Sequence, residues 1–188
     1  MAIYPGKMLD FMGNEFGQLR EYDESREQDW LLLDYPIHEA FANYRRTLNE
    51  LYRKYDAFWS GEYNPDHFLW LDCDHPELDA CAILRKGQEA TVFAAFNFGD
   101  TELKDYELTL PGKGKITPLL NSDWTCFGGR TARPKALRSK TTTGSVKLTL
   151  APYSAQLYRF EPAVEKETKA THPTSRLTDL TPPPTPRP

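Results

Sequence analysis

Residues 5–18 read PGKMLDFMGNEFGQ, a short apolar run that ends in a cluster of polar side chains. The apolar part, Met8 to Met12, predicts a strand, and Asn14, Glu15 and Gln18 follow where that strand ends. In a β/α barrel the carboxyl ends of the strands face the substrate. We therefore interpret the run as the last strand of a barrel, with polar side chains at the mouth of its cleft.

The chain is too short for the barrel that this strand implies. It has 188 residues, whereas a complete β/α barrel needs about 250. A polar loop follows the strand, and apolar side chains then recur at steps of three and four between Ile37 and Trp59, which predicts a helix after Pro36. The apolar stripe consists of Phe41, Tyr44, Leu48, Leu51, Tyr55 and Phe58. We expect residues 1–62 to form the strand, loop and helix of an incomplete barrel.

From Phe68 onward the apolar period changes to two. Short runs separated by turn residues predict an antiparallel β-sandwich over residues 63–161. In the last part, Val146, Leu148 and Leu150 would face inward. The expected strands are Phe68 to Leu71, Ala80 to Arg85, Ala90 to Asn97, Tyr106 to Leu110, Ile116 to Leu120, Val146 to Leu150 and Gln156 to Phe160. Residues 162–188 are rich in Pro and Thr, and we expect them to be a disordered tail.

Composition excludes several classes of protein. The net charge is −4 and no block of Lys or Arg marks a nucleic-acid binder. No stretch approaches about 18 consecutive apolar residues and the start is unlike a secretory leader, so we expect a cytoplasmic protein without membrane contact. The three cysteines are widely spaced with no C-x-x-C pair, so we expect reduced thiols and neither a zinc site nor a disulfide framework. Asp72-Cys73-Asp74-His75 offers metal ligands, but successive extended residues point in opposite directions, so we expect neither metal nor cofactor.

The opening run closely resembles the end of the catalytic barrel in 1,4-α-glucan (glycogen) branching enzymes of the α-amylase superfamily. Similar strings follow in the same order over about residues 5–161. They are REYD at 20–23, DWLLLDY at 29–35, LNELYR at 48–53, NSD at 121–123 and FGG at 127–129. The resemblance implies that the β-sandwich is the all-β domain that follows the barrel in that superfamily.

The resemblance also implies an activity. Branching enzymes cut an α-1,4-glucan, hold it as a covalent glycosyl-enzyme and transfer it to a 6-hydroxyl, which needs two carboxyl groups about 5 to 5.5 Å apart. Their catalytic Asp, Glu and Asp lie on earlier strands, so no catalytic residue is assigned here. The implied sugar-binding residues are Asn14, Glu15, Gln18, Arg20 and Trp30. Glu15 could instead pair with Arg20 or cap a short turn, and Trp30 could instead anchor the barrel wall.

Three interpretations stay open. In the favoured one, the chain is the C-terminal portion of a branching enzyme and is inactive alone. It would be a truncated gene product, a fragment, or the complement of a separate chain that carries the rest of the barrel. The second is a noncatalytic glucan-binding or interaction module, with Trp70, Trp124 and Tyr158 as a platform for glycogen or another α-glucan, although we expect Trp70 and Tyr158 to belong to the core instead. The third is a fragment of another enzyme of the superfamily. Asp10, within the predicted apolar strand, marks either a sugar cleft or a chain that no longer forms a barrel.

Overall fold

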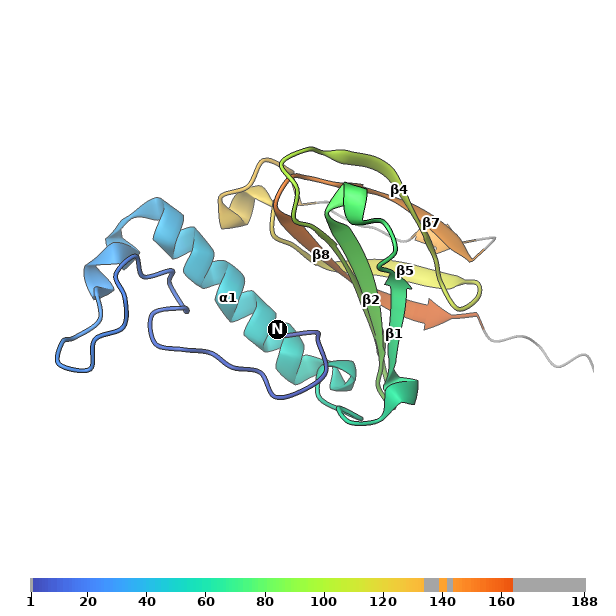
Figure 1. Ribbon diagram of the computed structural model, residues 1–188, viewed down its shortest axis with the longest axis horizontal. Coiled ribbons are helices and arrows are strands. Elements are labelled where there is room, and N and C mark those ends of the chain that lie inside the picture. The colour runs from blue at the N-terminus through green and yellow to red at the C-terminus, as the bar shows by residue number, and fades with distance from the viewer. Residues whose placement is uncertain (1, 134–138, 142–143, 164–188) are drawn as a thin grey trace, which may run out of the picture.

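Two facing β-sheets form the centre of the computed structural model, which describes residues 2–133, 139–141 and 144–163 (Figure 1). In these residues, six antiparallel strands make the larger sheet, in the order β1-β2-β3-β8-β5-β6, and β4 pairs with β7 in the smaller one. The strands are β1 (Phe68–Asp72), β2 (Ala80–Lys86), β3 (Thr91–Asn97), β4 (Leu103–Thr109), β5 (Gly114–Asn121), β6 (Ser139–Thr141), β7 (Ser145–Leu150) and β8 (Ser154–Pro162).

The predicted antiparallel all-β region is confirmed, with one strand more than expected. Each of the seven expected runs overlaps an observed strand. The additional strand, β6, has only three residues, Ser139–Thr141, and pairs with the start of β5. Its sequence, SKT, carries no apolar alternation, so nothing in the pattern distinguished it from a loop.

A first apolar core lies between the two sheets. Phe93 and Leu84 of the larger sheet are fully buried there against Leu108 and Leu150 of the smaller one. Val146, Leu148 and Leu150 alternate with more exposed neighbours along β7, which confirms the predicted inward face. This pattern is typical of a sandwich strand with one face in contact with water.

A second apolar core covers the opposite face of the larger sheet. Ile83 of β2 and Val92 and Ala94 of β3 pack there against Leu48 and Phe58, which lie in and just after the long helix. The larger sheet is therefore buried on both faces, and this explains why β2 and β3 read as continuous apolar runs rather than alternating ones.

The helix that covers this face is α1 (Pro36–Lys54). Pro36 occupies the first turn, where its missing N–H is tolerated. The helix ends five residues before the predicted Trp59, because the chain turns into a short 3₁₀ segment, Asp56–Phe58, that places Ala57 and Phe58 in the second core. Only the later half of α1 lies over the sheet, and its first turns extend past the sheet (Figure 1), where Ile37 is 64% exposed.

Two polar contacts hold the segment around α1 to the sheet. The Asp56 carboxylate accepts hydrogen bonds from the backbone N–H groups of Gln88, Glu89 and Ala90 in the β2–β3 turn. Arg85, fully buried in β2, donates to the carbonyl oxygens of Ile3 at 3.3 Å and Ser60 at 3.4 Å. The chain before α1 and the chain after it are thus both fixed to β2 and its turn.

The predicted strand at Met8 to Met12 is not formed. Residues 8–11 are irregular and a turn begins at Met12. No strand of the described part lies beside this segment, and an isolated strand leaves its backbone groups unpaired. Apolar sequence alone therefore did not produce a strand here.

Two other expectations fall at the limits of the structure. The predicted disordered tail begins at residue 162, but Pro162 still belongs to β8, and residues 164–188 lie outside the described residues. Among the residues that are described, no helix combines the length and the apolar character needed to cross a bilayer.

Candidate functional site

The polar loop after residue 12 has a fixed shape, set by a tight turn. Gly13 adopts φ +87°, a left-handed value that glycine reaches without strain, and its carbonyl oxygen accepts a hydrogen bond from the N–H of Gln18 at 2.9 Å. The turn buries Phe16, which contacts the Trp30 ring with 5.1 Å between ring centroids. The Phe16 carbonyl oxygen lies 2.9 Å from Nδ1 of His38 in α1. The loop is therefore seated on the start of the helix.

Gln18 and Arg20 brace this loop. Gln18 donates from Nε2 to the carbonyl oxygen of Arg20 at 3.2 Å and accepts from the N–H of Asp29 at 3.1 Å. Arg20 forms an ion pair with Asp29 at 3.1 Å and donates to the carbonyl oxygen of Glu27 at 2.9 Å. The predicted pair between Arg20 and Glu15 is wrong, because Asp29, brought close by the Gln18 contact, takes its place.

Asn14 and Glu15 lie at the outer side of the turn. Asn14 is exposed and Glu15 half-buried. Trp30 begins the 3₁₀ turn Trp30–Asp34 and is 47% exposed, although its ring contacts Phe16. Three of the five predicted sugar-binding residues thus carry side chains that a ligand could reach, while the other two hold the loop together.

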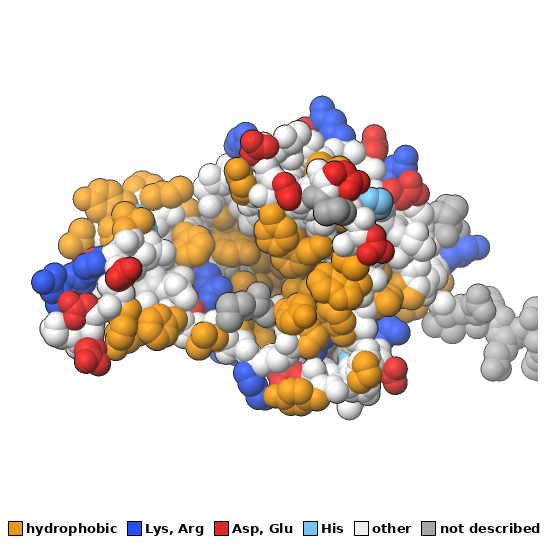
Figure 2. Space-filling view, in the orientation of Figure 1, with side chains coloured by type: hydrophobic (Ala, Val, Ile, Leu, Met, Phe, Trp, Pro, Cys, Tyr) orange, Lys and Arg blue, Asp and Glu red, His pale blue; other side chains and the backbone are white. Residues whose placement is uncertain are grey.

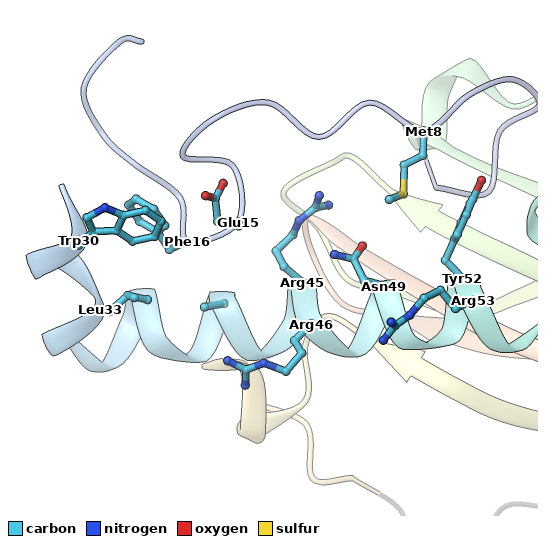
Figure 3. Close-up of a pocket in the computed structure, with 11 residues that line it drawn as sticks. Met8, Glu15, Phe16, Trp30, Leu33, Arg45, Arg46, Asn49, Tyr52 and Arg53 are labelled. Atoms are coloured by element: carbon cyan, nitrogen blue, oxygen red, sulfur yellow. The ribbon is translucent and has the colours of Figure 1, made fainter. Parts of the chain in front are cut away.

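A cavity of about 600 Å³ separates the N-terminal segment from α1. Glu15 and Trp30 line one end of it, and Asn14, Gln18 and Arg20 do not line it. Figure 3 shows Arg45 and Asn49 projecting from the helix toward the segment, with Met8 and Tyr52 at the far end. The structure therefore brings two of the five predicted residues to one cavity, together with helix residues that the sequence did not single out.

Polar atoms in this cavity are incompletely paired. Arg45 forms an ion pair with Asp10 at 2.7 Å, which accounts for the charged residue in the predicted apolar strand. Nε of Arg45 and Oδ1 of Asn49 are buried without a hydrogen-bond partner in the described part. A buried polar group without a hydrogen-bond partner costs about 1–3 kcal/mol of folding free energy. Partners for these two atoms are not found among the described residues.

The cavity does not have the groups for glycosyl transfer. Retaining chemistry needs two carboxyls across the scissile bond, and Glu15 is the single carboxylate among the described residues that line this cavity. Glu21 is exposed and lies outside the lining. What the arrangement offers is aromatic surface and hydrogen-bonding side chains, which suit binding rather than catalysis.

The later strings, NSD and FGG, form one turn that supports α1. The Asp123 carboxylate accepts from the hydroxyl of Thr131 and from the N–H of Arg130, the latter at 3.2 Å. Gly128 has φ +83° and lies against Ile37 of α1, and a side chain at Gly129 would collide with the Asp123 backbone. The glycines are therefore needed for close packing of this turn.

The aromatic platform predicted from Trp70, Trp124 and Tyr158 is not assembled. Trp124 is only 4% exposed and stacks on Phe127, and Tyr158 stacks on Phe93 in the first core. Burial raises the pKa of Tyr158 to about 12. Only Trp70, on the edge strand β1, is open to solvent, with 44% of its surface exposed.

Comparison with known proteins relates both regions to one family. Residues 70–161 match the family model for the alpha amylase C-terminal all-beta domain. The chain is 39% identical over 130 residues to the 1,4-alpha-glucan branching enzyme GlgB of Nocardia farcinica, covering 69% of this chain and 18% of the relative. It is 33% identical over 172 residues to the branching enzyme GlgB of Nitrosococcus oceani, covering 88% of this chain and 23% of that relative.

The chain thus spans about a fifth of the length of these relatives, 18% and 23%. The second alignment includes 88% of this chain, so it extends well beyond the matched all-beta domain into the loop and α1 region. By these sequence matches, the chain belongs to the glycogen branching enzyme family, to whose C-terminal portion it corresponds.

Proposed function

We propose that this chain works as the C-terminal portion of a 1,4-α-glucan branching enzyme whose catalytic carboxylates lie on residues outside it. The observation that carries the proposal is the similarity to branching enzymes over 130 and 172 residues. The cavity beside α1 offers a single carboxylate among its described lining residues, which supports the proposal that the chain alone does not catalyse glycosyl transfer.

The N-terminal segment supports a further step of the proposal, namely that residues 1–62 complete a β/α barrel. In the described part, residues 8–11 have no strand partner and are followed in sequence by α1. The last strand of a β/α barrel is likewise followed by a helix, but it is paired with neighbouring strands, which this segment lacks here. Strands of the remaining barrel would pair with this segment. They would also supply partners for the buried Nε of Arg45 and Oδ1 of Asn49.

An exposed aromatic face marks where that barrel would pack. We define this face by Tyr4, Trp70 and Phe98, which are 55%, 44% and 63% exposed. They surround a cavity of about 460 Å³ whose floor includes Ile83 and so continues the second core. Figure 2 shows hydrophobic side chains gathered in the hollow between α1 and the sheet. Apolar surface of this kind is characteristic of a protein interface.

We propose that the turn after residue 12 borders the glucan cleft of the completed enzyme. Asn14 and Glu15 would offer hydrogen bonds to sugar hydroxyls and Trp30 a ring for stacking on a pyranose, while Gln18 and Arg20 position the loop. The α-glucan is thus the proposed ligand, and a chain with the rest of the barrel the proposed partner. A cytoplasmic location remains a prediction.

A reconstitution experiment tests the proposal. The chain is mixed with the Nocardia farcinica enzyme shortened by the region that matches this chain, and branching of amylose is followed by iodine staining. We expect no branching from either part alone and recovery of activity in the mixture. The double variant Trp70→Ala/Phe98→Ala should abolish recovery, whereas Tyr63→Ala, an exposed aromatic outside the face, should not. Branching by this chain alone would refute the assignment.

The sugar-cleft residues are tested in the reconstituted enzyme. Asn14→Ala and Trp30→Ala should weaken glucan affinity and lower activity, whereas Glu24→Ala, on an exposed part of the same loop, should leave both unchanged. Unchanged glucan affinity in the first two variants would show that the turn does not border the glucan cleft. It would leave the family assignment unaffected.

A noncatalytic glucan-binding module is the second candidate, favoured by one observation. Trp70 stays half exposed beside the rings of Tyr4 and Phe68, at 6.4 Å and 5.4 Å between centroids. Electrophoresis of the chain through gels with and without glycogen distinguishes the two candidates. Retardation lost in Trp70→Ala would favour the binding module, and equal mobility in both gels would exclude it.

A further inference from the structure

Two cysteines that are eight positions apart in sequence lie at the end of the β1–β2 ladder: Cys73 directly after β1 and Cys81 within β2. In the β1–β2 ladder Trp70 pairs with Ile83, and Asp72 with Ala82 after a bulge. Cys73 directly follows Asp72, the last residue of β1, and Cys81 directly precedes Ala82 in β2, so the same register extended by one residue would set Cys73 opposite Cys81. Residues directly opposite on antiparallel strands place their side chains on the same face, with Cβ atoms about 4.5–5.5 Å apart. A disulfide needs about 3.5–4.5 Å, which a small shift of the strand end provides.

The pKa of the Cys81 thiol is raised, first by desolvation and then by its charged and titratable neighbours. The Cys73 thiol contributes to raising the pKa of Cys81, after desolvation and the Asp72 carboxylate. Both thiols also act on the buried Tyr106 hydroxyl, which donates to Asp72. Cys73, Cys81 and Tyr106 are therefore gathered around Asp72 at the end of β1.

The surroundings of the pair allow both access and movement. Cys73 is exposed, and Cys81 is half-buried. β1 is an edge strand, paired only with β2, and it leads directly into the loop that Cys73 begins (Figure 1). The loop returns to β2 through the 3₁₀ turn Pro76–Leu78, and the carbonyl oxygen of Asp79 accepts a hydrogen bond from the N–H of Phe98 at 2.8 Å. The far end of the loop is thus fixed, while the Cys73 end can adjust.

We propose that Cys73 and Cys81 are a cross-strand dithiol that oxidises to an intramolecular disulfide, a modification site independent of the proposed enzymatic role. With oxidised glutathione as oxidant, the Cys73 thiolate attacks one glutathione sulfur, forms a mixed disulfide and releases one reduced glutathione. The Cys81 thiolate then attacks the Cys73 sulfur and releases the second. Two electrons pass to glutathione, and the two thiol protons leave with the products.

Neighbouring carboxylates set the rate of this exchange. Desolvation, followed by Asp74 and Asp72, raises the pKa of the Cys73 thiol. Because the thiolate is the attacking species, the native pair reacts slowly at neutral pH. Replacing Asp74 by Asn removes a carboxylate whose oxygen lies 3.6 Å from the Cys73 sulfur and should accelerate closure.

The bond would fix β1 to the sheet. It would close a short loop and so remove conformational freedom from the unfolded chain, raising the unfolding midpoint by roughly 5 °C. Since β1 also carries Trp70, oxidation would fix one edge of the exposed aromatic face.

The experiment uses the full reduced chain, incubated with excess oxidised glutathione and followed by intact mass and thiol titration. We expect free thiols to fall from the three cysteines of the sequence to the single Cys126, with a mass loss of about 2 Da. Cys126→Ser should still close, and Asp74→Asn should close faster. In the Cys81→Ser variant the reaction should stop at the glutathione adduct on Cys73. Once circular dichroism has verified that this variant is folded, the adduct also shows that oxidised glutathione can reach Cys73. Three persisting thiols, or a stable adduct on Cys73 in the unmodified chain, would overturn the proposal.

Discussion

The sandwich and the segment before α1 contain similar apolar sequence but differ in how much of it is buried. In β3, Val92, Phe93, Ala94 and Ala95 are all fully buried, because each face of the sheet is covered. In the segment, Ile3 and Phe16 are buried, whereas Leu9, Phe11 and Met12 are 61%, 48% and 46% exposed. The difference teaches that an apolar run becomes a strand only where neighbours supply both hydrogen bonds and a covering layer.

Hydrogen exchange should give the largest contrast between these two regions. In the described part, no amide of residues 8–12 donates to a backbone carbonyl, while the amides of β3 lie between two paired strands. We expect protection in β3 to exceed that in residues 8–12 by about 10⁴-fold or more, since core amides exchange only through global opening. The measurement is native-state exchange read by mass spectrometry. Similar protection would mean that residues 8–12 are paired in solution.

A matched pair of core substitutions tests the same contrast in stability. Phe93 is 0% and Phe16 is 1% exposed, so burial alone predicts equal effects. We expect Phe93→Ala to cost about 3–5 kcal/mol of unfolding free energy. Phe16→Ala should cost under about 1 kcal/mol, because it loosens a segment that opens separately from the sheet. Urea denaturation followed by circular dichroism measures both, and equal losses would show that the two regions unfold as one.

Asp56 tests how firmly the two regions are joined. Its carboxylate accepts three backbone hydrogen bonds from the β2–β3 turn. We expect Asp56→Ala to lower the unfolding free energy by about 1–2 kcal/mol, because the partly exposed amides regain water as a partner. Asp66→Ala, in an exposed 3₁₀ turn, is the control and should change stability little. An equal, small effect at both positions would mean that the apolar contacts of Leu48 and Phe58 are enough to hold the α1 segment to the sheet without the Asp56 hydrogen bonds.

Alkaline pH should destabilise the sandwich through two tyrosines, with the smallest effect per residue among these predictions. Burial raises the pKa of Tyr158 to about 12 and raises that of Tyr106, to which the bond to Asp72 adds. In the unfolded chain both titrate near 10. The folded state therefore holds the protons longer, so the stabilisation is complete below pH 10 and is lost as pH rises from 10 toward 12. Tyr158→Phe should flatten this loss in urea midpoints measured between pH 8 and 11, and Tyr22→Phe should not.

Much of the fold could be predicted because its periodicity is local. The alternation of Val146, Leu148 and Leu150 placed β7 correctly, and the stripe containing Leu48 and Leu51 predicted α1. The short β6 could not be predicted, because three polar residues carry no period. The burial of Trp124 was missed for another reason, since it depends on the turn that brings Phe127 and Gly128 to the start of α1.

The candidate site was predictable only in part. Glu15 and Trp30 line one cavity, whereas Asn14 is exposed outside its lining, and a sugar-binding role for all three stays a prediction. The pairing of Arg20 with Asp29, and the cavity-lining side chains of Arg45 and Asn49, depend on how the loop folds back onto α1. No local pattern contains that information, because the partners are nine or more residues apart.

By itself, the sequence determined the family and the antiparallel β region, because motif strings and two-residue alternation are properties of short segments. Tertiary structure decided the rest. It decided that residues 8–12 have no strand partner in the described part, that both faces of the larger sheet are covered, and that the β1–β2 ladder ends next to Cys73 and Cys81. The physical reason is that strand pairing, burial and cross-strand contact each require a second segment whose position is fixed only when the chain folds.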